Sequence, residues 1–296
     1  MAEKPDTPAG AGAAATPQVR RMLFASDLSE VSDRAFAHAR FLSQWLGAKL
    51  VLYHAVETPP HHPEGLWERA DELRAGAEQA AREHLRGLAT QAEAPAEVVV
   101  EATHSAHRAV VRFAEKAAVD LAVMGTHGRE GLAHLLLGSV TEKLVQHGSC
   151  SVLCVREPEH GVHIPYRRVL VPTDLSPAAE RAFPLMALLA RRFEVDVVPI
   201  HVVRPGAADV PDEGRIRKSL EGSFADLRIL PRIASGTPWR TIVDVAGAES
   251  IDLIAMSTLG HDSLADTVLG STTERVVRHA PCPVLVARPP RAPASA

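Results

Sequence analysis

Two loops rich in small residues are the part of this sequence best suited to chemistry. Residues 125–128 read Gly-Thr-His-Gly and are followed, after nine intervening residues, by Gly138 and Ser139; residues 257–260 read Ser-Thr-Leu-Gly and are followed at the same spacing by Gly270 and Ser271. Glycines after an apolar strand, with Gly-Ser at a helix start, present backbone N–H groups and a helix dipole to an anion. The pattern predicts phosphate binding at two places. The competing interpretation is a plain turn between strand and helix, for which this spacing is not needed.

The loops are part of an internal repeat. Asp27 aligns with Asp174 and His54 with His201 at an offset of 147 residues. Later positions align at an offset of 132, namely His104 with Gly236, Gly128 with Gly260, Gly138 with Gly270 and Cys150 with Cys282. The difference predicts one deletion of about fifteen residues between the second and third strands of the second copy. The sequence is therefore interpreted as a duplicated domain, and two domains fit its 296 residues.

Strands of continuous Val, Leu and Ile alternate with segments of helical period, which indicates a parallel sheet covered on both faces. We expect an α/β chain with two tandem doubly wound five-stranded parallel sheets, each in strand order 3-2-1-4-5 with helices on both faces. Strands are predicted at residues 21–26, 49–56, 96–101, 121–125 and 151–155, and in the second copy at 168–172, 195–203, 226–233, 253–257 and 283–287. Helices of the first copy are predicted at 29–46, 64–90, 106–118 and 139–147. Pro184 lies inside the first helix of the second copy, where it would remove a hydrogen bond.

These elements divide the chain into a disordered tail at 1–18, a first domain at 19–156, a linker at 157–165, a second domain at 166–290 and a short tail at 291–296. Each domain ends in a short apolar strand whose exposed edge needs a cover. Pairing the two last strands antiparallel would give an internal pseudo-dimer. A further homodimer of the whole chain is left open.

Asp27 and Asp174 follow the first strand of each copy, and the small-residue loops follow the fourth. In a doubly wound sheet the ligand lies beyond the carboxyl ends of the strands where strand order reverses, here between strands one and four. The aspartate and the loop should therefore flank one crevice in each copy. Because a carboxylate repels phosphate, the aspartate should face the uncharged end of the ligand, with phosphates on the amides of Gly128, Gly138 and Ser139. An alternative for each aspartate is a helix N-cap, and one residue can do both.

Composition limits the class of function. Apolar residues make up 46% of the chain and charged residues 23%, with a net charge of −4, so no basic stripe for nucleic acid is present. Three cysteines, Cys150, Cys154 and Cys282, are expected to be buried small side chains in a reducing compartment. The fifteen histidines show no convincing metal-ligand spacing, and residues 10–16 lack the bulky apolar run of a secretory signal. We expect a cytoplasmic protein with no metal site, no nucleic-acid partner and no membrane segment.

Residues 25–29 (Ala-Ser-Asp-Leu-Ser), 52–56 (Leu-Tyr-His-Ala-Val) and 171–176 (Val-Pro-Thr-Asp-Leu-Ser), with the spaced glycine motif, resemble the universal stress protein family. The resemblance covers residues 20–288 and suggests a tandem member. It implies pairing of domains through the last strand and binding of ATP or a related adenine nucleotide, with Mg²⁺ as an optional companion. It also implies a set of ligand contacts. They are Asp27, Ala55, Met124, Gly125, Gly128, Gly138, Ser139 and Val140 in the first copy, and Asp174, Val202, Met256, Gly260, Gly270, Ser271 and Thr272 in the second.

The two copies depart from the family pattern at different places. The first has Ala25 where the second has Pro172, whereas the second has Ser257 in place of the first loop glycine. A Cβ at position 257 would block close backbone approach or a positive φ, so the second copy is the weaker candidate. The predicted function is a stress-response protein that binds nucleotide and regulates unknown protein partners. The alternatives are a slow ATP hydrolase using His127 or Arg129, without a P-loop lysine or a carboxylate pair for metal, and a nucleotide-free scaffold.

Overall fold

The computed structural model describes residues 18–58, 67–93, 95–126, 137–156, 164–207, 209–258 and 270–289. Outside these residues lie positions 1–17 of the first predicted tail, the whole second tail, most of the predicted linker and the centres of both small-residue loops, including His127, Gly128, Arg129 and Gly260.

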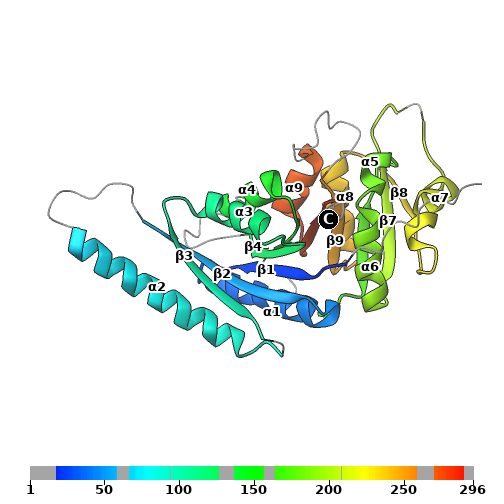
Figure 1. The fold of residues 1–296 in the computed structure, drawn as a ribbon. Helices are drawn as coiled ribbons and strands as arrows, with labels where there is room; N and C mark the ends of the chain where they lie inside the picture. The colour runs from blue at the N-terminus through cyan, green and yellow to red at the C-terminus, as the bar shows by residue number, and fades with distance from the viewer. Residues whose placement is uncertain are drawn as a thin grey trace, which may run out of the picture.

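Ten strands form one continuous sheet in the order β3-β2-β1-β4-β5-β10-β9-β6-β7-β8 (Figure 1). The first half contains β1 (Arg21–Ala25), α1 (Glu30–Leu46), β2 (Lys49–Glu57), α2 (Trp67–Ala89), β3 (Glu97–Thr103), α3 (Ala106–Lys116), β4 (Leu121–Gly125), α4 (Ser139–His147) and β5 (Ser151–Val155). The second half contains β6 (Arg168–Pro172), α5 (Pro177–Glu180), α6 (Phe183–Phe193), β7 (Asp196–Val203), α7 (Glu213–Phe224), β8 (Arg232–Ser235), α8 (Pro238–Ala248), β9 (Leu253–Ser257), α9 (Ser271–His279) and β10 (Val284–Ala287). Each half has the predicted order 3-2-1-4-5.

The two halves join through their last strands. β10 pairs antiparallel with β5, with Leu285 opposite Leu153, whereas the other strand pairs are parallel. This confirms the antiparallel pairing predicted from the two apolar edges. It also merges the two expected sheets into one, because hydrogen bonding across the junction leaves no gap between them.

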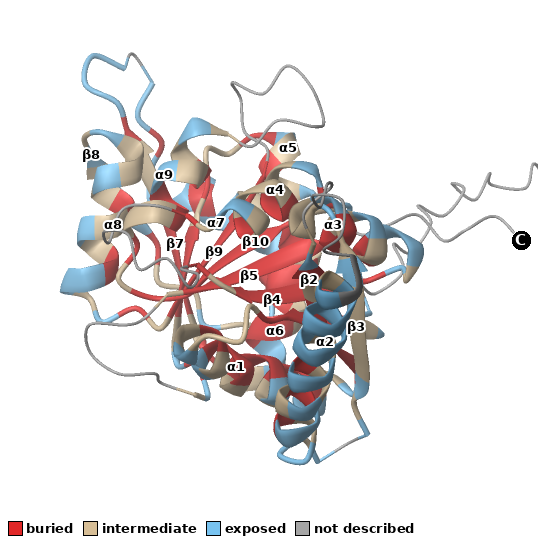
Figure 2. Cartoon of the chain, turned by 90° about the vertical axis from the view of Figure 1, so that its left-hand side faces the viewer, coloured by how far each residue is buried: buried red, intermediate tan, exposed pale blue. Residues whose placement is uncertain are grey.

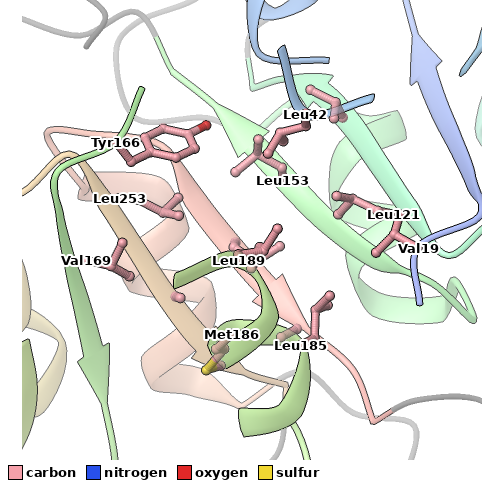
Figure 3. Close-up of a cluster of buried hydrophobic side chains, with 14 of the residues drawn as sticks. Val19, Leu42, Leu121, Leu153, Tyr166, Val169, Leu185, Met186, Leu189 and Leu253 are labelled. Carbon is pink, nitrogen blue, oxygen red and sulfur yellow. The ribbon is translucent and has the colours of Figure 1, made fainter. Parts of the chain in front are cut away.

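The buried side chains form two clusters, one on each face of the sheet. One cluster gathers α1, α2, α6 and α7, and the other gathers α3, α4, α8 and α9. Figure 2 shows the consequence, with buried strands in the middle and exposed surfaces on the helices. Figure 3 shows that the first cluster is continuous across the junction, since Leu42 and Leu153 of the first half lie near Tyr166, Leu189 and Leu253 of the second.

Strand register supports the repeat and corrects its gap. Arg21 pairs with Lys49 and Arg168 with Asp196, which is the predicted offset of 147. Val56, however, pairs with Ala102, whereas its counterpart Val203 pairs with Ser235, so the offset at the third strand is 133. The prediction of a single gap is therefore wrong, because one of the missing residues belongs to the turn after β8.

Two further expectations for the second half need correction. The predicted third strand at 226–233 is only a short β8 at Arg232–Ser235, preceded by an isolated bridge between Val197 and Ile229. Pro231 lies between the bridge and the strand and cannot donate to a ladder. The predicted first helix is divided into α5 and α6, so that Pro184 lies in the first turn of α6, where its missing N–H costs little.

Candidate functional site

The aspartate after the first strand belongs to the same backbone turn in both halves. Oδ1 of Asp27 accepts from the amide of Ser29 at 3.0 Å, and Oδ1 of Asp174 accepts from the amide of Ser176 at 3.0 Å. The N-cap is the serine in each case, since Ser29 accepts from Ser32 N and Ser176 from Ala179 N. The N-cap alternative therefore applies to the serines, and the aspartates hold the turn that precedes the cap.

The residue between aspartate and serine adopts a left-handed conformation in both halves. Leu28 has φ 62° and Leu175 has φ 59°. A bulky residue in this region is strained by about 1–2 kcal/mol. The same strained turn at the carboxyl end of β1 and of β6 fixes the direction in which each chain leaves the sheet.

The helix that follows each small-residue loop begins without a side-chain cap. Gly138 is the N-cap of α4 and Gly270 that of α9, and neither helix start receives a side-chain hydrogen bond within the described residues. The Gly138 amide donates to Thr126 O at 2.7 Å, and the Gly270 amide to Thr258 O at 3.3 Å. The expectation that the Gly138 amide faces a phosphate is therefore not met in this structure. The helix-start amides that follow it are left to interact with an anion.

A pair of buried threonines, which the sequence analysis missed, fixes each helix start against the fourth strand. The hydroxyl of Thr141 donates to Gly125 O at 2.8 Å, and that of Thr273 donates to Ser257 O at 3.1 Å. The two residues align at the offset of 132, which was the signal available in the sequence. They hold the strand end and the helix start together at the switch point.

A cavity of about 350 Å³ opens at this point in the second half. Its size lies within the usual range for small-molecule sites. The residues that line it come from the ends of β6, β7 and β9 and from the starts of α5, α8 and α9. They are Pro172, Thr173, Asp174, Ala179, Ile200, His201, Val202, Val203, Arg204, Ala207, Asp209, Pro238, Ile242, Met256, Ser257, Thr258, Gly270, Ser271, Thr272 and Thr273.

The structure brings together the predicted residues of the second half that it describes. Asp174, Val202, Met256, Gly270, Ser271 and Thr272 all line the cavity, and Gly260 lies outside the described residues. In the first half, Asp27, Ala55, Met124, Gly125, Gly138, Ser139 and Val140 occupy the equivalent ends of β1, β2, β4 and α4, and Gly128 lies outside the described residues. Sequence reasoning did not single out Arg204 or Pro238, which also line the cavity.

Ser257 does not close the site. It lines the cavity, and Gly125, its counterpart, has no positive φ. A Cβ built on Gly125 would lie 3.6 Å from Ser32 Cα and 3.7 Å from Ser32 N, which are ordinary contacts. The backbone at this position therefore has no positive φ that would require glycine, and the protein's own atoms leave room for a Cβ.

The histidines in the C-terminal parts of β2 and β7 are each in contact with a backbone carbonyl after the first strand. His54 Nδ1 lies 2.7 Å from Ser26 O, and His201 Nδ1 lies 3.0 Å from Thr173 O. Both bonds tie the second strand to the end of the first. His201 in addition lines the cavity.

The cysteines are free and buried, as expected, and burial raises the pKa of Cys154 and of Cys282 to about 12. The described residues contain no group of three or more His, Cys, Asp or Glu side chains placed to hold a metal ion. Among them, no helix combines the length and apolar character that a membrane crossing requires.

A family model for the universal stress protein family matches residues 18–156 and again residues 165–288. The chain belongs to the universal stress protein family. It carries two such domains in tandem, which agrees with the repeat and with the two equivalent halves of the sheet.

Curated relatives carry the same family name. Universal stress protein MJ0531 of Methanocaldococcus jannaschii is 32% identical over 143 residues, which is 47% of this chain and 84% of that protein. Universal stress protein Rv2005c of Mycobacterium tuberculosis is 29% identical over 184 residues, 57% of this chain and 62% of the relative. Among solved structures, a universal stress protein from Archaeoglobus fulgidus superposes with a TM-score of 0.68 at 23% identity, covering 92% of this chain and 97% of the other. At that identity the likeness concerns the fold.

Proposed function

We propose that this universal stress protein is a regulatory module that binds ATP or a related adenine nucleotide. The observation that carries the proposal is the cavity of about 350 Å³ at the switch point of the second half, lined both by an aspartate after β6 and by an uncapped helix start after β9. Ligands of doubly wound sheets bind in this position. Change of bound nucleotide would alter the surfaces that protein partners contact, which is how a module without catalysis acts in a stress response.

The cavity offers different chemistry along its length. Ile200, Val202 and Met256 give apolar walls near Asp174, which suits a flat base whose exocyclic or ring nitrogens meet a carboxylate. At the other end, the first turn of α9 presents Ser271 and Thr272 with the positive end of a helix dipole. A base at the Asp174 end and phosphates at α9 satisfy both ends. Mg²⁺ would enter with a triphosphate.

The first half offers the same elements, so we propose a nucleotide there as well. Ser139 opens α4 as Ser271 opens α9, and Asp27 repeats the turn of Asp174. The glycine loop of the first half keeps both family glycines. The expected stoichiometry is two nucleotides per chain.

Native mass spectrometry of the full chain titrated with ATP tests the proposal by counting bound nucleotide. The variants are Val202→Trp and its matched counterpart Ala55→Trp, which place an indole at equivalent half-buried positions. Wild type should bind two nucleotides, each variant one and the double variant none. If wild type binds no nucleotide, the proposal is rejected in favour of a nucleotide-free scaffold. If the double variant still binds two nucleotides, they do not bind at the proposed sites beside Ala55 and Val202.

A further inference from the structure

A second cavity of about 320 Å³ lies beside the first in the second half. The two cavities share Arg204, Pro238, Ser271 and Thr272 in their linings, so they are contiguous at the start of α9. The remaining residues that line the second cavity are Pro205, Gly236, Thr237, Trp239 and Arg275. The name annex is used below for this second cavity.

The annex is built for negative charge. Its described lining contains two arginines, Arg204 and Arg275, and no carboxylate. It also lies between two helix starts, since Thr237 is the N-cap of α8 and Gly270 that of α9, and neither start has a side-chain cap within the described residues. Two helix starts and two arginines that border one space favour an anion over a cation or an apolar group.

Trp239 restrains the arginines of this region. The guanidinium carbon of Arg275 lies 5.8 Å from the centre of the indole ring and that of Arg240 lies 5.4 Å from it. The centre of the His279 ring lies 5.0 Å from the centre of the Trp239 ring. Cation–π contact reduces the freedom of Arg275, so less entropy is lost when it binds an oxyanion.

The first half shows what the equivalent helix start accepts. There Glu57 Oε1 accepts a hydrogen bond from the amide of Ala106, the first residue of α3, at 2.6 Å. The chain's own carboxylate thus provides negative charge at that helix start. At the offset of 147 the counterpart of Glu57 is Arg204, and at the offset of 132 the counterpart of Ala106 is Pro238, which has no N–H. The second half therefore has a cation where the first half has the anion, and an anion there would meet Arg204 and the later amides of α8 instead.

We propose that the annex binds a phosphate attached to the sugar of the nucleotide, in addition to the 5′ phosphate chain held at α9. This inference rests on the proposed function of the second half. The annex is bordered by Arg204, which follows the base-side residues Val202 and Val203 of β7, and by Ser271 at the phosphate-side start of α9. Because it touches both sides of the first cavity, it opens beside the sugar that joins the base to the 5′ phosphates. The ligand class is a nucleotide with two separate phosphorylated positions, such as a nucleoside 3′,5′-bisphosphate.

The test compares adenosine 3′,5′-bisphosphate with ADP, which carries two phosphates on one position. Binding is followed by the fluorescence of Trp239 in a full chain carrying Trp45→Phe and Trp67→Phe, so that the signal reports the second half. The bisphosphate should bind about tenfold more tightly than ADP, as expected for one charge-assisted contact. Arg275→Gln should reduce this preference to about twofold or less. It should leave the affinity for ADP within about twofold, because Arg275 lines the annex and does not line the first cavity.

Two further variants control the result. Arg240→Gln removes the same charge from the neighbourhood of Trp239 without touching the lining, and it should keep the preference. Arg204→Glu replaces a cation of the annex with the carboxylate that the first half has at this position, and should abolish the preference. If ADP binds and the bisphosphate binds no better, or if the preference survives Arg275→Gln, the annex proposal is overturned and the nucleotide proposal stands. If neither ligand binds to the second half, both are overturned there.

Discussion

The first half covers the ends of β1 and β4 with one continuous helix, α1, whereas the second half covers the ends of β6 and β9 with the separate helices α5 and α6. Ser32 in the first turn of α1 approaches Gly125 closely enough that a Cβ there would touch it. Its counterpart at the offset of 147, Ala179, lines the cavity in the second half. The registers of the first strand with the second and fourth strands agree between the halves, so at the crevice the halves differ in what caps it.

Charge differs at the same edge of the sheet. Glu57 at the end of β2 caps α3, and Arg204 after β7 lines both cavities. The two halves therefore share their strand order and differ in the residues at the ends of the strands. Since ligands of this fold bind at strand ends, the two halves have the means to differ in ligand preference without any change in fold.

The largest expected effect concerns whether the two halves unfold together or independently. Leu153 and Leu285 face each other across the junction, both buried in a cluster that includes residues of both halves. Truncating either to alanine leaves a cavity and should cost about 3 kcal/mol of unfolding free energy. Because the cluster is shared, either change should lower one common transition in chemical denaturation monitored by circular dichroism.

Leu73→Ala is the control for the junction variants, since Leu73 is 68% exposed on α2. It should change stability by less than about 0.5 kcal/mol. Two separate transitions, of which Leu153→Ala shifts one and Leu285→Ala the other, would show that the halves unfold independently.

The next effect depends on pH and on a residue that differs between the halves. His38 of α1 is buried, with Nδ1 2.7 Å from the hydroxyl of Tyr166 and Nε2 without a partner in the described residues. Burial lowers the pKa of His38 from 6.5 to about 4. Between these pH values the unfolded chain takes up a proton that the folded chain does not, so folding stability falls as the pH falls from 6.5 toward 4.

His38→Leu introduces the residue that the second half has at the equivalent position, Leu185. Between pH 7 and pH 5, wild type should lose about 2 kcal/mol through this histidine, and the variant should lack that loss. Urea denaturation at both pH values measures the difference. Tyr166→Phe, which keeps the histidine, should retain the pH dependence; equal slopes for wild type and His38→Leu would contradict the assignment.

Repetition made most of the fold predictable. Apolar strands that alternate with helical segments predicted a doubly wound sheet, the repeat predicted two copies of it, and the two unpaired edges predicted the antiparallel junction. The first expectation of two separate sheets failed at one point only, because hydrogen-bond continuity across an edge is a property of the assembled pair. The sequence showed that Pro184 would interrupt a continuous helix. It did not show that a new helix begins at Phe183, because that depends on the neighbouring backbone.

The candidate site was predictable in its ends and not in its detail. Asp174 and Ser271 were found from spacing, since both follow strand ends in a known topology. The engagement of the Gly138 amide by Thr126 O depends on local backbone geometry, which spacing does not determine. Arg204 was missed because a lone arginine after a strand carries no signal until its counterpart Glu57 is seen at a helix start.

We expect a smaller effect on stability at the C-terminal ends of α1 and α6. Gly47 has φ 65° and its counterpart Glu194 has φ 51°, so both end their helices in the left-handed conformation. Only glycine adopts it without strain, so Glu194→Gly should stabilise the chain by about 1 kcal/mol and Gly47→Glu should destabilise it by about the same amount. No atom lies within 4 Å of a Cβ built on Gly47, so crowding does not confuse the result. Thermal denaturation measures both, and shifts of equal sign would contradict the comparison.

The smallest effect tests the anion preference of the helix start that the annex argument uses. Glu57→Gln keeps an acceptor for the Ala106 amide and removes the charge, so it should cost about 0.5 kcal/mol at low ionic strength. Salt screens the interaction of a charge with a helix dipole, so the cost should shrink at about 1 M sodium chloride. Glu72→Gln, on the exposed side of α2, is the matched control and should be neutral at both salt concentrations. If the two variants behave alike, the carboxylate of Glu57 does not stabilise α3 through its charge, and the first half would no longer be evidence that a helix start at this edge of the sheet favours an anion.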